Sequence, residues 1–361
     1  MLTVGRALIF CVVLFFYLHI HYHLKTSSDL EVYELSSPSK ETLEEICDLR
    51  QPTRFDFRSD SLTSRIRCME EEYGAFEVRV RDMTSSLGEG DDPYVALPLG
   101  NVAQALERDK NSRYVIESNS SFLDETGLAK TYSAADPYLR PYMVASRTYD
   151  VLAGSRGART QLRRELNYRT YFISVMGSVS IKLAPPKADR YLYPVYDYCN
   201  FEFRSPVDPW APQAMYESDF AKVKCLDVQL APGQALFVPA YWWYSIEFSS
   251  HEDRVACCKY TTYMSALATA NHSLLWALQS QNLKHTVPTE RLEGPEELPG
   301  NPKTTISSLK QESTDVVPPQ PKAAGDGDVQ AAAQEEEGGD AEGEDKARVA
   351  EPDLSHASAA P

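Results

Sequence analysis

Two short stretches of alternating residues constrain the fold of this chain most strongly. The first, "RTYFISVMGSVSIKLAPP" (169–186), has apolar side chains at every second position on either side of Gly177 and ends in two prolines. The second, "LDVQLAPGQALFVP" (226–239), repeats the pattern around a Pro-Gly pair. Period-two alternation is typical of strands, and a Pro-Gly pair is typical of a tight turn. Many short strands joined by such turns predict a mainly β domain, built as a closed or two-sheet antiparallel barrel.

Three motifs resemble those of cupin-like JmjC-type domains. They are "RTQLRRE" (159–165), "GSVSIKLAPP" (177–186) and "PGQALFVPAYWWYSIE" (232–247). The similarity extends over residues 137–264, with a weaker echo in "RQPTRFDF" (50–57), and the asparaginyl hydroxylase that inhibits hypoxia-inducible factor is a similar protein. The resemblance implies a double-stranded β-helix, which is a jelly-roll or cupin barrel, with flanking helices. Enzymes of this family use Fe(II) and 2-oxoglutarate to hydroxylate or demethylate protein side chains.

The resemblance also implies where iron ligands would lie. The family holds iron with a histidine, a carboxylate two residues later and a distant histidine, and these positions fall at Arg163, Glu165 and Tyr244. A guanidinium has no free lone pair, so Arg163 cannot be a ligand. Glu165 is chemically capable, whereas tyrosine ligates iron in few proteins. We expect Arg163 to contact Glu165 or Tyr244 instead, which would form a polar plug where iron sits in relatives.

Other positions of the implied pocket are changed as well. The lysine that grips 2-oxoglutarate falls at Val179, and a site-lining asparagine falls near Lys259. Thr160 and Tyr171 match the family, and Trp243 belongs to the same predicted pocket lining.

Loss of both histidines and of the lysine, with the framework motifs intact, favours a catalytically inactive pseudoenzyme. Such a domain would bind neither a metal nor a cofactor and would act as a protein-binding module. The alternatives are an oxygenase that uses Fe(II) and 2-oxoglutarate with an atypical ligand set, and a different fold. The cysteines lack C-x-x-C spacing, so no zinc site is expected.

The N-terminal stretch "ALIFCVVLFFYLHIHYHL" (7–24) contains no charged side chain. A bilayer core is crossed by about 20 mostly apolar residues in a helix. We therefore predict that residues 1–27 are a single-pass signal anchor, and that the domain lies on the lumenal side of the endomembrane system. A cleaved signal peptide and a buried helix of a soluble protein are the alternatives.

Composition divides the remainder of the chain into three parts. Residues 28–45 read as a polar stalk, residues 46–285 as the cupin-like domain and residues 286–361 as an acidic tail. From Val287 onward there are 17 acidic and 6 basic residues, so −11 of the net charge of −16 belongs to this tail. Too few apolar groups remain there to offset chain entropy, which predicts disorder. The negative balance argues against a nucleic-acid partner, since phosphates attract basic surfaces.

Overall fold

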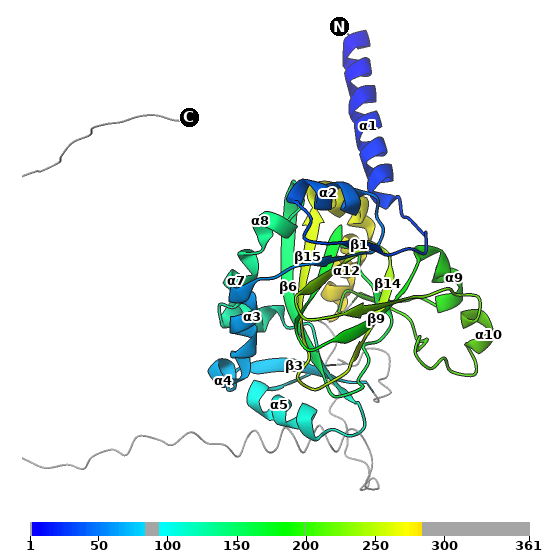
Figure 1. Cartoon of the computed structure of the whole chain (residues 1–361). Coiled ribbons are helices and arrows are strands. Elements are labelled where there is room, and N and C mark those ends of the chain that lie inside the picture. The colour runs from blue at the N-terminus through cyan, green and yellow to red at the C-terminus, as the bar shows by residue number, and fades with distance from the viewer. Residues whose placement is uncertain (1, 84–93, 199, 284–361) are drawn as a thin grey trace, which may run out of the picture. The chain divides into compact units, whose positions relative to one another are not determined.

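The computed structural model describes residues 2–83, 94–198 and 200–283, and strands dominate its domain (Figure 1). The described strands are β1 (Tyr33–Leu35), β2 (Thr53–Asp56), β3 (Glu77–Asp82), β4 (Tyr94–Pro98), β5 (Tyr114–Ile116), β6 (Val144–Gly154), β7 (Arg163–Arg164), β8 (Arg169–Met176), β9 (Val179–Ala184), β10 (Val195–Asp197), β11 (Glu202–Arg204), β12 (Leu226–Leu230), β13 (Gln234–Pro239), β14 (Trp243–Phe248) and β15 (Arg254–Thr262). The described helices are α1 (Leu2–Leu24), α2 (Lys40–Asp48), α3 (Asp60–Arg67), α4 (Met69–Tyr73), α5 (Leu99–Arg108), α6 (Ser120–Glu125), α7 (Ala129–Ser133), α8 (Asp136–Leu139), α9 (Asp189–Leu192), α10 (Glu217–Phe220), α11 (Tyr263–Ala268) and α12 (Ala270–Leu283), with a 3₁₀ turn at Pro186–Ala188.

Within these residues the strands form two sheets. The larger has nine strands in the order β1-β2-β13-β8-β15-β6-β5-β3-β4, and the smaller has six in the order β10-β11-β7-β14-β9-β12. The predicted turn at Gly177 joins β8 to β9, so the alternating stretch 169–186 passes from one sheet to the other. Gly177 has a φ of +66°, a conformation that glycine adopts without steric cost. This arrangement confirms the expected β barrel with flanking helices.

Two apolar cores bury the two faces of the nine-stranded sheet. The core between the sheets contains Phe172, Leu236, Ile246 and Phe248. The second core lies under the helices that cover the other face, and it includes Leu43, Phe55, Leu62, Phe122, Tyr132 and Tyr171. Strand β8 contributes alternate residues to both cores, so it is buried on both faces. The six-stranded sheet and the centre of the larger sheet therefore enclose the barrel interior in which the candidate site lies.

The predicted stalk, residues 28–45, is part of the folded domain instead. Strand β1 pairs in parallel with β2, and Tyr33 lies opposite Thr53. Helix α2 begins after Ser39, whose side chain accepts a hydrogen bond from the backbone of Thr42, and it buries Leu43 in the helix-side core. The stalk prediction was wrong because a three-residue strand and a short, mostly polar helix leave too weak a periodic pattern.

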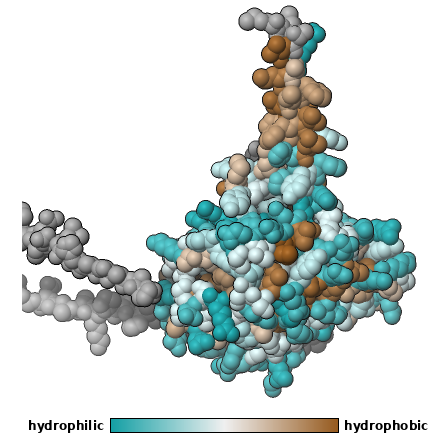
Figure 2. All heavy atoms as spheres, turned by 45° about the horizontal axis from the view of Figure 1, so that its top comes forward, coloured by the Kyte–Doolittle hydropathy of each residue, from teal (hydrophilic) through white to brown (hydrophobic). Residues whose placement is uncertain are grey.

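Helix α1 fits the prediction of a helix long enough to cross a membrane. Val4–Leu24 has a mean hydropathy of 1.8, and most of its large apolar side chains are exposed. Figure 2 shows the apolar surface of this helix in brown. At its carboxyl end the guanidinium of Arg50 donates to the carbonyl oxygen of His23 at 3.1 Å and also to that of Lys25. The last carbonyls of a helix lack partners within it, so Arg50 fastens this end to the domain. The predicted tail, residues 286–361, lies outside the described residues.

Candidate functional site

The short strand β7 brings together the first and the last of the three predicted ligand positions. In the antiparallel pair of β7 and β14, Arg163 lies directly opposite Tyr244. Side chains of directly opposed residues project to the same face of a sheet. The Nε of Arg163 donates to the phenolic oxygen of Tyr244 at 3.0 Å, and the guanidinium lies 5.5 Å from the centre of the tyrosine ring.

Glu165 completes this arrangement together with Lys259 of β15. The Tyr244 hydroxyl donates to Oε1 of Glu165 at 2.8 Å, and the Lys259 ammonium binds the same oxygen at 2.6 Å. The structure therefore unites four residues that the sequence placed in the pocket. Lys259 stands where the resemblance expects an asparagine. Its ammonium supplies the counter-charge for the Glu165 carboxylate.

Glu117, which follows β5, is a member of the site that sequence reasoning missed. Its Oε2 lies 2.9 Å from Nη2 of Arg163, and its Oε1 lies 3.3 Å from Nη1 of Arg81. The Glu117 side chain is 1% exposed and that of Arg163 is 9% exposed, so this ion pair is buried. Glu117 lies outside the region of resemblance, and its sequence signal is a single carboxylate directly after the apolar strand "YVI". We call Arg81, Glu117, Arg163, Glu165, Tyr244 and Lys259 the polar cluster.

The electrostatics of the polar cluster keep its carboxylates and cations charged. Burial alone raises the pKa of Glu117, but Arg163 and Arg81 outweigh it and hold the pKa below the usual value. Burial likewise raises the pKa of Glu165, and Lys259 followed by Arg163 brings it below the usual value. Burial, with the Glu165 carboxylate adding to it, raises the pKa of the Tyr244 phenol far above its usual value despite the nearby Arg163. Tyr244 is therefore a neutral hydrogen-bond donor.

These residues do not fit an iron ion. Arg163 offers no lone pair, and the protonated Tyr244 would have to lose its proton to become a ligand. The Glu165 oxygen Oε1 already accepts from two donors. Among the described residues, no group of three or more histidine, cysteine, aspartate or glutamate side chains could hold a metal ion.

Two other predicted pocket residues serve the framework of the barrel. Thr160 is buried, and its hydroxyl oxygen accepts from the backbone N–H of Ile246 at 2.8 Å. Val179 is fully buried in the core between the sheets, opposite Phe248. Lys182 points to the other face of β9 and pairs with Asp227 at 3.2 Å. The position that the family resemblance assigns to the 2-oxoglutarate lysine is therefore apolar here.

Tyr171 does not line the pocket, contrary to our prediction. It packs in the helix-side core, with its hydroxyl 3.5 Å from the sulfur of Cys47, and Phe172 faces the polar cluster instead, with its ring centre 4.8 Å from that of Tyr244. A strand buried on both faces is apolar at successive positions, so its sequence does not tell which face lines the barrel.

Trp243 does not line the pocket either, contrary to our prediction. Its indole N–H donates to Asp189 at 2.5 Å, and the ring packs with Leu162 and Leu192 under α9. This core lies on the face of β14 opposite to the one that carries Tyr244. Aromatic residues at the successive positions 243 and 244 made both faces of β14 look alike in the sequence.

Comparison with known proteins places this geometry in a family. The sequence profile of the cupin-like domain matches residues 56–268, which is more than half of the chain. The chain belongs to the cupin-like domain family. Curated relatives with a similar segment are the HSPB1-associated protein 1 of Bos taurus, Rattus norvegicus and Homo sapiens, each 32% identical over 95 residues. That segment is 26% of this chain and 20% of each relative, so the chain matches only about a fifth of the length of these proteins.

Proposed function

We propose that this chain is a catalytically inactive cupin-like domain that is tethered to a membrane by α1 and acts by binding a protein partner. The observation that carries the first part is the buried ion pair of Arg163 and Glu117, which continues through Tyr244 to Glu165. These side chains fill the positions that the family resemblance assigns to iron, and each charged group among them has a counter-charge within the cluster. An oxygenase needs a set of metal ligands there together with open coordination positions. Of Arg163, Tyr244 and Glu165, only Glu165 can serve as a ligand without losing a proton.

Turnover of 2-oxoglutarate tests catalytic inactivity. The purified full-length chain is incubated with Fe(II), ascorbate and 2-oxoglutarate, and succinate is measured against a heat-killed sample. We expect no succinate above that background. Succinate that disappears in the Glu165→Ala variant would show an oxygenase with an atypical ligand set.

A surface of exposed aromatic and apolar side chains supports the protein-binding part. On the β10–β11 side Tyr193, Val195, Tyr196 and Phe201 are exposed, and the Phe201 ring lies 6.5 Å from that of Trp276 on α12. We call these five residues the aromatic surface. Contiguous exposed apolar patches mark interaction sites, and aromatic residues are enriched in protein interfaces. The relatives are named for association with HSPB1, which makes HSPB1 the first partner to probe.

Binding to HSPB1 is measured by surface plasmon resonance with the detergent-solubilised full-length chain. We expect binding that falls at least about tenfold in a Phe201→Ser/Trp276→Ala variant, because aromatic anchors dominate interface energies. A Tyr142→Ser variant removes a ring elsewhere that is more exposed than either Phe201 or Trp276, and it should bind normally. Equal binding by the unsubstituted chain and by both variants would show that HSPB1 contacts a different surface. No binding by the unsubstituted chain would exclude HSPB1 as the partner.

The proposed lumenal orientation is tested with the two N-glycosylation motifs, at Asn119 and Asn271. Asn271 is exposed, whereas Asn119 is buried and its amide donates to the carbonyl oxygens of Arg79 and Glu117. In a lumenal domain we expect one glycan, removed by glycosidase and absent from Asn271→Gln. An unglycosylated chain that still reaches the membrane would favour a cytosolic domain.

A further inference from the structure

Exposed apolar side chains of the domain lie on, or directly beside, the segments that contact α1. Helix α11 packs against α1, and the backbone N–H of Tyr263, the first residue of α11, donates to the carbonyl oxygen of Met143 at 3.2 Å. Leu49 adjoins Arg50, which donates to the carbonyl oxygens of His23 in α1 and of Lys25 just after it. Tyr142, Met143, Tyr263, Leu49 and Leu267 are 76%, 72%, 61%, 52% and 41% exposed. We call these five residues the collar.

Side chains of the domain also contact the carboxyl end of α1 directly. Arg50 donates to the carbonyl oxygen of His23 and its guanidinium lies 4.6 Å from the centre of the Tyr22 ring. The rings of His23 and Tyr168 also make an edge contact, with their centres 5.1 Å apart. Because 28–45 is folded into the domain rather than extended as a stalk, a bilayer crossed by α1 would begin directly beside the collar.

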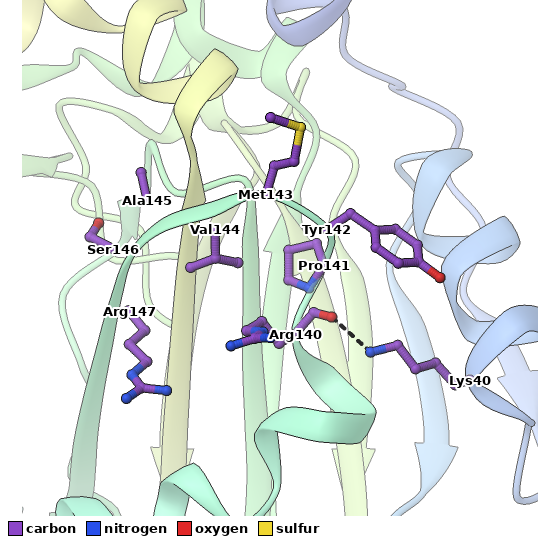
Figure 3. Close-up of a pocket in the computed structure, with 9 residues that line it drawn as sticks. All are labelled: Lys40, Arg140, Pro141, Tyr142, Met143, Val144, Ala145, Ser146 and Arg147. Atoms are coloured by element: carbon purple, nitrogen blue, oxygen red, sulfur yellow. Dashed lines mark hydrogen bonds between the residues drawn. The ribbon is translucent and has the colours of Figure 1, made fainter.

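The chemistry of the collar suits the headgroup region of a bilayer better than water. Tyrosine carries an apolar ring with a polar tip, which is why it gathers at membrane–water boundaries. Figure 3 shows Met143 and Tyr142 projecting from the segment before β6, with Lys40 on the side of Tyr142. The Lys40 ammonium donates to the carbonyl oxygen of Arg140 at 3.0 Å and lies 6.0 Å from the centre of the Tyr142 ring. Lys40 thus places a cation next to the Tyr142 ring, where a headgroup phosphate would meet it.

We propose that the collar docks on the phospholipid surface, so that the domain lies against the membrane instead of hanging from it. This inference rests on the proposed membrane-spanning role of α1 and adds to it a fixed orientation of the barrel. The occupant is the interfacial layer of the same bilayer, because α11, which carries Tyr263 and Leu267 of the collar, packs against α1. Docking of the collar would also leave the aromatic surface of β10–β11 and α12 free for a protein partner.

Depth-dependent fluorescence quenching tests the docking. The full-length chain is reconstituted in phosphatidylcholine vesicles and labelled with an environment-sensitive dye at Met143→Cys, or at Met215→Cys as a matched control. Met215 is 74% exposed and precedes α10, which Figure 1 shows on a different side of the domain from α2. The unsubstituted chain, labelled in parallel, gives the background from native cysteines. Headgroup-attached nitroxide lipid is then added as the quencher.

Interfacial side chains lie roughly 5–10 Å into the headgroup boundary, so the probe at residue 143 should lose about half of its emission while the probe at residue 215 keeps nearly all of it. Resistance to alkaline carbonate extraction is measured on the same vesicles. If the chain resists carbonate extraction but neither probe is quenched, the docking is overturned and the membrane anchor is supported. Extraction by carbonate would overturn the anchor and the docking together. A probe at residue 143 that is shielded equally in detergent and in vesicles, without lipid quenching, would assign the collar to a second protein chain and overturn the proposal.

Discussion

At the residue scale, Glu117 is the carboxylate on which the polar cluster most depends. It is the ion-pair partner of both Arg163 and Arg81, and its side chain is 1% exposed. Removing one partner of a buried ion pair costs about 3–5 kcal/mol, because the remaining charge stays desolvated. We therefore expect Glu117→Ala to lower the free energy of unfolding by about 3 kcal/mol or more in urea titrations. Glu72→Ala is the control, since its ion pair with Arg65 is exposed and should contribute less than about 1 kcal/mol.

Glu165 is predicted to matter less than Glu117, because about a fifth of its side chain is exposed. Glu165→Ala strands the Lys259 ammonium and the Tyr244 hydroxyl, and we expect a loss of about 2 kcal/mol or more. An apolar replacement of both charges avoids the stranded ammonium. The Glu165→Ala/Lys259→Met variant should therefore recover part of that loss in the same urea titration. A double variant less stable than the single one would show that the pair is not coupled as the structure indicates.

The lowered pKa values of Glu117 and Glu165 set the sign of a pH dependence. Both lie below the unfolded value of about 4.3, so the unfolded chain binds more protons as the pH falls. Their contribution to stability is complete above about pH 5 and is lost as the pH falls through the folded pKa values. Between pH 7 and pH 3.5 the urea midpoint should fall less steeply in Glu117→Gln than in the unsubstituted chain. Parallel slopes would contradict a charged Glu117 in the folded protein.

At the scale of elements, the sequence predicted strands well and their faces poorly. The alternating stretches 169–186 and 226–239 became β8, β9, β12 and β13, because period-two patterns and turn residues are local signals. Whether Tyr171 or Phe172 lines the barrel depends on which layer covers each face, and that is a tertiary property. The ligand positions on β7 and β14 were placed together by resemblance, whereas Glu117 follows β5 and lies outside the segment 137–264 that carried the resemblance.

The elements that precede β2 provide a prediction of their own. A variant lacking residues 1–27 keeps β1 and α2, whereas one lacking residues 1–45 loses β1 and the part of α2 that buries Leu43. Burying a leucine side chain contributes about 1.5–3 kcal/mol, and 1 kcal/mol shifts the Tm of a domain of this size by about 2–4 °C. We expect the longer deletion to melt at least about 5 °C below the shorter one by circular dichroism. Equal melting temperatures would restore the interpretation of residues 28–45 as a stalk.

At the scale of the whole molecule, composition predicts how the chain divides into segments better than it predicts the contacts between those segments. The apolar segment 7–24 is a single helix, and its hydropathy alone was enough to find it. That Arg50 fastens this helix to the domain could not be read from the sequence, because the contact joins residues about 25 positions apart. The acidic tail remains a prediction from charge and composition.

The central claim is that an ion-paired polar cluster replaces the iron site of this barrel, and anaerobic titration of the full-length chain with Fe(II) in the presence of 2-oxoglutarate tests it most directly. Bound iron is measured per chain after removal of free metal. We predict no saturable uptake, and the same baseline for the unsubstituted chain and for Glu165→Ala, because Arg163 and the protonated Tyr244 offer no ligand. Uptake of one iron per chain that is lost in Glu165→Ala but kept in Glu72→Ala would contradict the account.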